Sequence, residues 1–259
     1  MIIVDQLNRE IQLNGAPKRI VSLVPSQTEL ICDLGLENEL VGITKFCVHP
    51  NHIRKFKTVV GGTKQVRLDK IKTLDPDIIL CNKEENTEEM VSELSGIAPV
   101  HVSDISSIDD CLVLIKEYGS IFKRENKASI IIDHIIQSLN DFQEKISSKS
   151  IKKVAYFIWK DPWMLAGKAT FIDHLLRVNK FENVVEQNRY PEVALETFLK
   201  QCNPDLIFLS SEPFPFKQKH IIELERLTNA KIQLVDGEYF SWYGSRLVKA
   251  FDYFKTLIY

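Results

Sequence analysis

The chain has 259 residues, of which 44% are hydrophobic, 26% charged and 9% aromatic, the composition of an ordinary folded protein. At about 150 residues per domain, this length predicts roughly 1.7 domains, which is compatible with two lobes. Its 33 basic and 35 acidic residues nearly cancel. The chain therefore lacks the broad positive field of a non-specific nucleic-acid-binding protein. No apolar run approaches the roughly 18 residues that cross a bilayer, so no membrane-spanning segment is predicted.

The first residues of the chain and the pattern of cysteines indicate the cellular compartment of the protein. Met1–Glu10 lacks the basic region, the long apolar region and the cleavage site of a secretory signal, so the residues alone predict a cytoplasmic protein. The five cysteines are odd in number, scattered and without a C-x-x-C pair. This pattern favours reduced, mostly buried thiols over a disulfide framework or a zinc site. They are Cys32, Cys47, Cys81, Cys111 and Cys202.

A long helix is predicted in the middle of the chain. Between Ser120 and Asp161 there is neither glycine nor proline, although the chain has ten of each. Apolar residues recur here at steps of three and four, which predicts an amphipathic helix of roughly 40 Å from about Phe122 to Ser147. It is either a long surface helix or a rigid strut between two halves. The recurring residues are Ala128, Ile131, Ile132, Ile135, Ile136, Leu139, Phe142 and Ile146.

Matching strand patterns on either side of this helix favour the strut. Three short apolar segments before it have counterparts after it, offset by 134, 128 and about 132 residues, which is close to half the chain. These offsets indicate an internal duplication. The matched pairs are Arg19–Leu23 with Lys153–Phe157, Asp75–Leu80 with Asn203–Phe208, and Pro99–Asp104 with Lys231–Asp236.

Helical patterns such as Thr28–Leu34 and Phe171–Val178 lie between the strands, so each half is predicted to form βαβ units on a mostly parallel sheet. The predicted fold class is α/β, with two Rossmann-like lobes joined by one long helix. We expect an N-terminal lobe over 1–121, a bridging helix over 122–148 and a C-terminal lobe over 149–259. Because ligands bind outside the carboxyl ends of parallel strands, a ligand cleft is expected between the lobes.

Residues that follow the predicted strands are therefore candidate ligand contacts. Ser26 with Glu29 has the spacing of a capping box, and Thr170 is the candidate cap of a second helix. The simple interpretation is a well-made helix start, and the functional one is that free amides there face a polar or anionic ligand group. Trp159, Trp163 and Trp242 all follow strands. A single tryptophan is more often part of a core, but three in such segments favour a flat, bulky ligand.

Motifs for catalysis, nucleotide binding and metal binding are weak or missing. Cys47, His49 and His52 supply ligand types in one short segment, but no second cluster completes a tetrahedral set, so their contact with a metal stays open. The chain has no G-x-S-x-G elbow, no G-x-G-x-x-G motif and no Walker loop. We therefore expect no enzyme, no catalytic residues and no intrinsic cofactor.

Several motifs in register carry a family resemblance that extends from Pro17 over nearly the whole chain. They are Arg19–Leu30, Leu34–Leu36, Leu40–Gly42, His49–Pro50, Gly61–Gly62, Leu74–Leu80, Asn203–Ile207 and the terminal helix Phe240–Phe254. In these motifs the chain closely resembles the cobalamin- and iron-siderophore-binding proteins of ABC importers. The resemblance implies a class III periplasmic-binding-protein fold with one bridging helix. It also implies reversible capture of a metal chelate (a corrinoid such as cobalamin, a ferric siderophore or haem) in the cleft between the lobes.

Carried over position by position, the resemblance implies particular site residues. The cobalamin-binding members have an aromatic residue where this chain has Lys64. One acidic residue on each lobe is implied to dock the permease, namely Asp69 and Glu196; their alternative role is ordinary negative charge at a helix start. The implied ligand contacts are Ser26, Phe46, Lys64, Trp159, Trp163, Glu238, Phe240, Trp242 and Arg246.

The resemblance also implies partners and a location. It predicts a monomer that delivers its ligand to an ABC permease dimer, in the periplasm or at the cell surface. Met1–Glu10 lacks the export signal that this location needs, so either the native start lies upstream of Met1 or the protein is a cytoplasmic relative that binds, stores or senses the chelate. That alternative is a cytoplasmic metal-cofactor-binding or cofactor-processing protein on the same scaffold. A pure interaction module, with no ligand for the cleft, is a third and weaker alternative.

Overall fold

The computed structural model describes residues 1–257. The chain divides into two compact units. Unit 1 contains Met1–Ile135 together with Tyr243–Arg246, and unit 2 contains Ile136–Trp242 together with the chain from Leu247 onward. The boundary falls inside the long helix α6 (Glu125–Ile146). The chain therefore passes between the units within α6 and again on either side of Tyr243–Arg246.

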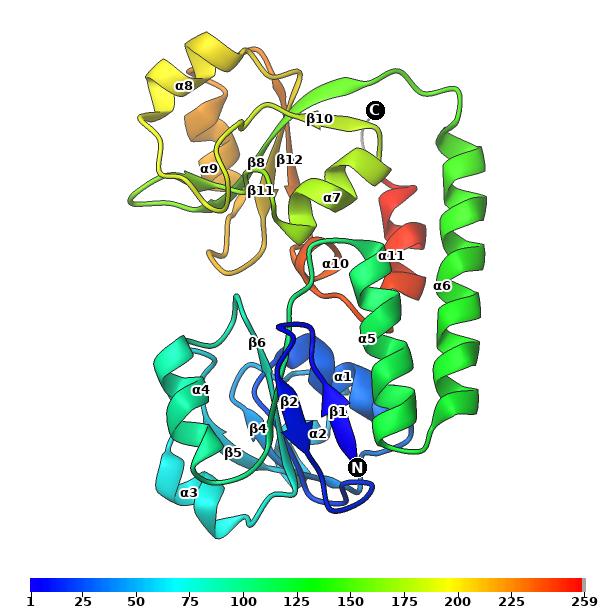
Figure 1. Ribbon diagram of the computed structural model, residues 1–259. Helices are drawn as coiled ribbons and strands as arrows, with labels where there is room; N and C mark the ends of the chain where they lie inside the picture. Colours follow the sequence, from blue (N-terminus) through cyan, green and yellow to red (C-terminus); the bar gives the residue numbers. More distant parts are fainter. Residues whose placement is uncertain (258–259) are drawn as a thin grey trace. The chain divides into compact units, whose positions relative to one another are not determined.

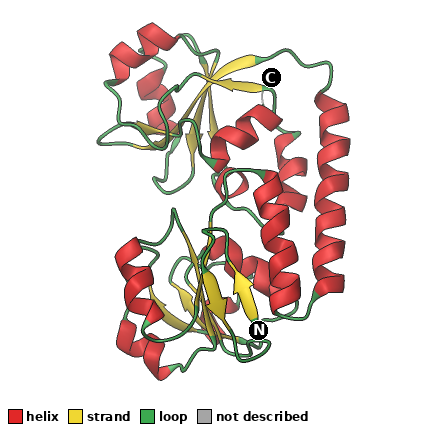
Figure 2. Ribbon diagram, in the orientation of Figure 1, coloured by secondary structure: helices red, strands yellow, loops and turns green. Residues whose placement is uncertain are grey.

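Unit 1 is built on a five-stranded parallel sheet in the order β5-β4-β3-β6-β7. Helices cover both faces (Figures 1 and 2): α3 and α4 pack on one face, and α1 and α5 lie on the other. The interior strand β6 is buried along its whole length, as expected for a strand covered on both faces. The elements are β3 (Ile20–Ser22), α1 (Pro25–Asp33), β4 (Leu40–Thr44), α2 (Ile53–Phe56), β5 (Thr58–Gly61), α3 (Leu68–Thr73), β6 (Ile78–Asn82), α4 (Glu88–Ser95), β7 (Val100–Ser103) and α5 (Ile108–Ile121).

Unit 2 has a smaller sheet of the same kind, in the order β10-β8-β11-β12, with β9 paired antiparallel to β8. Helices α8 and α9 pack on one face through Leu199, Ile221 and Leu224. On the other face, the fully buried Phe240 of α10 packs against Tyr156 and Phe208. The elements are β8 (Lys152–Trp159), β9 (Met164–Leu165), α7 (Phe171–Val178), β10 (Phe181–Asn183), α8 (Leu195–Cys202), β11 (Leu206–Ser210), α9 (Gln218–Leu224), β12 (Lys231–Val235), α10 (Glu238–Ser241) and α11 (Leu247–Phe254).

The strand register supports the internal duplication. Val21 pairs with Ile79 in unit 1, and Ala155 pairs with Ile207 in unit 2, which are the same positions of the two repeats. The aspartate before the second strand of each pair also has the same role. Asp77 accepts a hydrogen bond from the backbone of Arg19 at 2.9 Å, and its counterpart Asp205 accepts one from Lys153 at 2.8 Å. In both units this aspartate fixes the start of the neighbouring strand.

The predicted central helix is confirmed, although it begins three residues later than expected. Ala128, Ile135, Phe142 and Ile146 are all buried, as the spacing predicted, whereas Ile136, which was expected to widen the apolar face, is 40% exposed. The helix begins at Glu125 rather than Phe122 because the separate helix α5 ends at Ile121. Lys123 then has a left-handed φ of 57°, which a continuous α-helix cannot contain. The spacing of apolar residues along one face of a helix does not reveal a break at a single residue.

The thiols agree with the predicted reduced state. All five cysteines are free, and Cys47, Cys81 and Cys111 are buried. Burial raises the pKa of Cys81 and of Cys111 to about 12, so these thiols stay protonated and unreactive at neutral pH. Within residues 1–257, no helix has the length and apolar character needed to cross a membrane.

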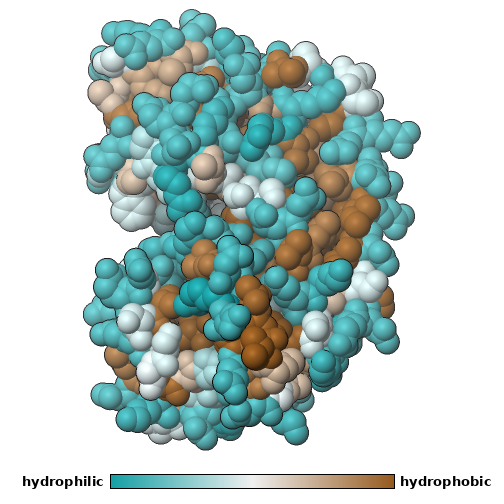
Figure 3. Space-filling view, in the orientation of Figure 1, coloured by the Kyte–Doolittle hydropathy of each residue, from teal (hydrophilic) through white to brown (hydrophobic). Residues whose placement is uncertain are grey.

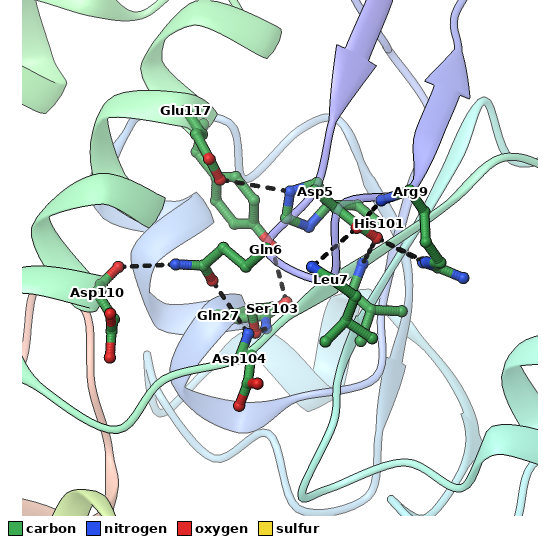
Figure 4. Close-up of polar contacts among 12 residues, drawn as sticks. Asp5, Gln6, Leu7, Arg9, Gln27, His101, Ser103, Asp104, Asp110 and Glu117 are labelled. Atoms are coloured by element: carbon green, nitrogen blue, oxygen red, sulfur yellow. Dashed lines mark hydrogen bonds and ion pairs between the residues drawn. The ribbon is translucent and has the colours of Figure 1, made fainter.

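An N-terminal hairpin that the sequence did not predict closes the edge of the sheet in unit 1. Strands β1 (Ile2–Val4) and β2 (Glu10–Gln12) pair antiparallel. Asp5, in the connecting turn, is 3% exposed and accepts hydrogen bonds from the Arg9 side chain at 2.6 and 2.9 Å. It also accepts one from the backbone N–H of Val102 in edge strand β7 at 3.1 Å. Figure 4 shows Asp5 beside Arg9. The Asp5 carboxylate thus accepts from a backbone N–H of the edge strand that would otherwise be free to pair with another strand.

The outer face of this hairpin is apolar. Ile2 and Val4 are 70% and 51% exposed, and Val113 on α5 is 49% exposed. Figure 3 shows apolar colour gathered over β1 and α5. Nothing among the described residues covers this patch.

The charge of Asp5 is expected to stabilise unit 1 in a pH-dependent way. Burial opposes its ionisation, but hydrogen bonds from Arg9 and Val102 outweigh this effect and hold the pKa of Asp5 below its usual value. A lowered folded-state pKa contributes stability that is complete above the unfolded-state value of about 4 and is lost as the pH falls through the folded-state value. Asp5→Asn should therefore lower the free energy of unfolding by about 2 kcal/mol at neutral pH. Urea unfolding of both proteins across the pH range measures the difference.

The exposed, neighbouring change Glu10→Gln serves as a control and should have little effect. A difference between Asp5→Asn and the parent protein that does not shrink below about pH 4 would contradict this account of Asp5.

Candidate functional site

Loops that follow the strands gather at the carboxyl edge of the sheet in unit 1. The backbone N–H of Lys45, after β4, donates to Gly61 at the end of β5 at 2.8 Å. Asn86, after β6, donates through its side chain to the carbonyl of Thr63 at 2.8 Å. The N–H of Lys83 donates to Ser103 at the end of β7 at 2.9 Å. The loops at 45–49, 61–64 and 83–86 therefore form one continuous surface within this unit.

Two of the predicted contacts, Phe46 and Lys64, lie on this surface. Phe46 is 48% exposed, and the Lys45 ammonium lies 4.9 Å from its ring centroid. A Cβ added to Gly62 would come within 3.2 Å of the Phe46 ring, so a glycine at this position leaves room for the ring. Lys64 is exposed, and its ammonium donates to the carbonyl of Glu84. An exposed aromatic face and a nearby cation are thus available to a ligand.

The expected capping box at the start of α1 is wrong. The N-cap residue is Val24, which makes no side-chain cap, and Pro25 occupies the first helical turn. Ser26 is only 4% exposed and hydrogen-bonds to Tyr243. Glu29 does not reach back to the helix start, because it pairs with Arg246 instead. The second predicted cap is confirmed: Thr170 accepts from the backbone of α7 through its hydroxyl group.

Gln27 is the centre of a fully buried hydrogen-bond network in unit 1 (Figure 4). Its Nε2 lies 2.7 Å from Ser103 Oγ on β7 and 3.0 Å from the hydroxyl group of Tyr243. Its Oε1 accepts from the hydroxyl group of Tyr118 on α5 at 2.9 Å. Nε2 also donates to the carbonyl oxygen of Cys81 at 3.1 Å. One side chain thus joins α1, two strands, α5 and the segment Tyr243–Arg246.

A buried ion pair anchors the same segment. Arg246 Nε lies 2.8 Å from Glu29 Oε2, and Arg246 Nη2 lies 3.0 Å from Glu29 Oε1, a bidentate arrangement. The two side chains are 6% and 9% exposed. Arg246, a predicted ligand contact, is therefore already paired within unit 1. In a buried, bidentate pair of this kind, the loss of either side chain leaves the charge of the other buried without a partner.

In unit 2, the residues after the strands form an aromatic cluster. Trp159, the last residue of β8, is 38% exposed and lies edge-to-face with Phe214 at 5.6 Å. Trp163 stacks on Phe216 at 6.0 Å between ring centroids, with the Lys160 ammonium 5.1 Å from the Trp163 ring. Trp159 thus offers an open ring face, whereas Trp163 is partly covered.

The remaining predicted contacts lie close to α10. Phe240 has no exposed surface, and Trp242 is 7% exposed with its indole N–H donating to Glu212 at 2.9 Å. Ser241 donates to the same carboxylate oxygen at 2.7 Å. Glu238, at the start of α10, is partly exposed. Burial makes Phe240 and Trp242 part of the packing of unit 2, while the Glu238 side chain keeps access to solvent.

The segment Cys47–His52 does not form a metal site in the described structure. The Cys47 thiol is fully buried and lies 3.1 and 3.2 Å from the hydroxyl groups of Thr28 and Thr44. His52 instead lies 2.8 Å from Glu37. In residues 1–257, no group of three or more His, Cys, Asp or Glu residues is arranged to hold a metal ion.

Breaking the buried ion pair should strongly destabilise unit 1. Glu29→Gln leaves the Arg246 charge buried without its partner, and we expect a loss of about 3 to 5 kcal/mol in the free energy of unfolding. The double change Glu29→Met with Arg246→Met removes both charges and should recover much of that loss. Denaturant unfolding of the single and double variants gives the coupling energy. The matched change Glu37→Gln is made at an exposed pair and should cost little; a Glu29→Gln cost equally small would refute the role of the pair.

Comparisons with known proteins agree with this architecture. An uncharacterized ABC transporter substrate-binding lipoprotein of Bacillus subtilis is 28% identical over 99% of this chain and 85% of its own length. A vitamin B12-binding protein of Pectobacterium atrosepticum is 22% identical over 90% of this chain and 86% of its own length.

Solved structures show the same fold. The periplasmic vitamin B12-binding protein of Vibrio cholerae has a TM-score of 0.81 at 18% identity, over 93% of this chain and 98% of its own. A periplasmic heme-binding protein of Roseiflexus has a TM-score of 0.79 at 16% identity, over 90% of this chain and 95% of its own. The predicted α/β fold of the class III type is thereby confirmed. The periplasmic binding protein family model matches residues 20–231, most of the chain, and the chain belongs to that family.

Proposed function

We propose that this protein is the substrate-binding component of an ABC importer and that it captures a metal chelate for delivery to a permease dimer. The chelate is of the corrinoid, ferric siderophore or haem class. The observation that carries the proposal is the exposed aromatic surface at the carboxyl ends of the strands, Phe46 in unit 1 and Trp159 in unit 2. Open aromatic faces suit a large, flat ligand, and relatives with this fold bind vitamin B12 or heme.

The predicted contacts divide by exposure into two groups. Phe46, Lys64, Trp159 and Glu238 have accessible side-chain surface and are proposed to touch the chelate, with Trp163 in partial contact. The others are buried and are proposed to act through the shape and stiffness of the loops. They are Ser26, Phe240, Trp242 and Arg246. Binding is reversible and needs no intrinsic cofactor, because the chelate is cargo.

We also propose a location outside the cytoplasm, in the periplasm or at the cell surface. Support comes from the relatives, which include a substrate-binding lipoprotein and periplasmic proteins. The protein is proposed to act as a monomer that meets its permease at the membrane.

Two exposed carboxylates are proposed as permease contacts. Asp69 lies in the first turn of α3 and Glu196 in the first turn of α8. The Glu196 carboxylate is 4.0 Å from the Lys200 ammonium, and both side chains are mostly exposed, so this pair adds little to stability. Exposed charge with little structural function is available for a partner.

Ligand titration tests the proposal directly. Cyanocobalamin, haemin and ferric hydroxamate and catecholate chelates are titrated into the protein by calorimetry and by tryptophan fluorescence. One class is expected to bind with 1:1 stoichiometry and to quench the fluorescence. Trp159→Ala should weaken that ligand about tenfold by calorimetry, as expected for one aromatic contact. Leu227→Ala is a matched control, since Leu227 is 39% exposed but precedes β12. Lack of binding by every chelate would disprove the proposed function.

Charge reversal tests the docking residues separately. Asp69→Lys with Glu196→Lys should abolish chelate uptake in cells that contain the permease, because two attractive contacts become repulsive. The chelate affinity of the purified variant should stay within about twofold of the parent protein. Glu88→Lys, in the exposed first turn of α4, controls for a general effect of added positive charge. Normal uptake by the double variant would rule out these two residues as permease contacts.

A further inference from the structure

Glu212, in the loop after β11, ties this loop to the end of α10, and no role has been given to it above. Its Oε1 accepts from the Ser241 hydroxyl group at 2.7 Å and from the Trp242 indole N–H at 2.9 Å. Ser241 is the last residue of α10, and Trp242 follows it directly. All three residues belong to unit 2. One carboxylate oxygen thus joins the loop 211–216 to the end of the helix.

Gly237 allows α10 to approach Glu212 this closely. A Cβ added to Gly237, the residue before α10, would lie 2.6 Å from Glu212 Cγ and closer still to Ser210 Oγ. Both distances are shorter than van der Waals contact, so a larger side chain at this position would push the helix away from the loop. The Gly237 N–H also donates to Ser211 Oγ at 2.9 Å. The loop is therefore held to both ends of α10.

Within the loop, Phe214 connects Glu212 to the exposed ring of Trp159. The backbone N–H of Phe214 donates to the carbonyl of Ile158, the residue before Trp159 in β8, at 3.3 Å. The Phe214 ring lies edge-to-face with Trp159, with 5.6 Å between the ring centroids. It also packs edge-to-face on the buried ring of Phe216 at 4.7 Å. Two steps along the chain and one ring contact thus separate the anchor at Glu212 from a proposed chelate contact.

We infer that Glu212 is a positioning residue of the ligand-binding surface in unit 2. Its carboxylate fixes the loop 211–216 against α10, so that Phe214 holds the Trp159 ring in the orientation that receives the chelate. Glu212 acts through these two rings and not by contact with the chelate. An aromatic face that is already fixed loses less conformational entropy when it binds, which is the physical basis of this role. The inference rests on the proposed chelate-binding function, because it concerns a residue that supports that surface.

A double-mutant cycle with Trp159 tests the inference. Calorimetry gives the affinity of each variant for cyanocobalamin, haemin and ferric hydroxamate and catecholate chelates. Glu212→Ala removes the acceptor and should weaken the chelate that binds by about fivefold. In the Trp159→Ala background, the same change should cost less than about twofold, because the ring that Glu212 positions is already gone.

Two further variants separate the hydrogen bonds from the negative charge. Glu212→Gln keeps an acceptor oxygen at the same reach, so its affinity should stay within about twofold of the parent protein. Trp242→Phe removes the indole donor and keeps an aromatic ring; it should weaken binding about threefold, and this loss should also disappear in the Trp159→Ala background. Glu225→Ala is the matched control, since Glu225 is an exposed carboxylate of unit 2 that precedes β12, and it should bind like the parent.

The outcomes separate this inference from the proposed function. If the parent protein binds none of these chelates, the proposed function fails and the inference fails with it. If the parent binds one of them and Glu212→Ala and Trp242→Phe bind it equally well, the inference alone is wrong. A fivefold loss that persists in the Trp159→Ala background also contradicts it, because Glu212 would then act independently of that ring. An equal loss in Glu212→Gln and Glu212→Ala would show that the charge, and not the acceptor, supports binding.

Discussion

Parallel pairing of the strands is the constraint on which each unit depends. Because neighbouring strands run in the same direction, the loops that follow them emerge at one edge of each sheet, and the side chains proposed to contact a ligand are brought together there. The start of this pairing is fixed in the same way in both units, by Asp77 and by its counterpart Asp205, whose carboxylates accept from the backbone of the adjacent strand. Phe46 and Trp159 lie at these edges, where they are 48% and 38% exposed.

Buried polar contacts give the edge of unit 1 its stiffness. Gln27 and Glu29 on α1 hold Tyr243 and Arg246, so a segment from the far end of the chain completes the unit. Asn82 and Asn86 fix the turn between them and join it to the neighbouring loop. Satisfied networks of this kind favour one arrangement, since any shift leaves buried donors unpaired. A preorganised surface loses less entropy when it binds a ligand.

Much of this architecture could be predicted because repeated patterns reflect repeated packing. The offsets between matched strands anticipated the two sheets, and the spacing of apolar residues anticipated the buried face of α6. Isolated contacts between distant residues could not be predicted in this way. The spacing of Ser26 and Glu29 matches a capping box, yet the Glu29 partner lies 217 residues away. Similarly, the short β1–β2 hairpin has little periodicity, and Asp5 is joined to the sheet through the distant Val102. Which side chains are exposed at the edge also depends on packing that the sequence pattern does not reveal.

The central claim is that the loops at the carboxyl ends of the strands are the ligand-binding surface. Hydrogen–deuterium exchange, measured with and without a saturating chelate, tests it at the level of segments. We predict slower exchange in the loops 45–49, 61–64 and 83–86 of unit 1 and 159–163 and 211–216 of unit 2. Segments at the amino ends of the strands, such as 95–99 and 203–205, should be unchanged. Protection confined to the amino-end segments, with none in the carboxyl-end loops, would contradict the account.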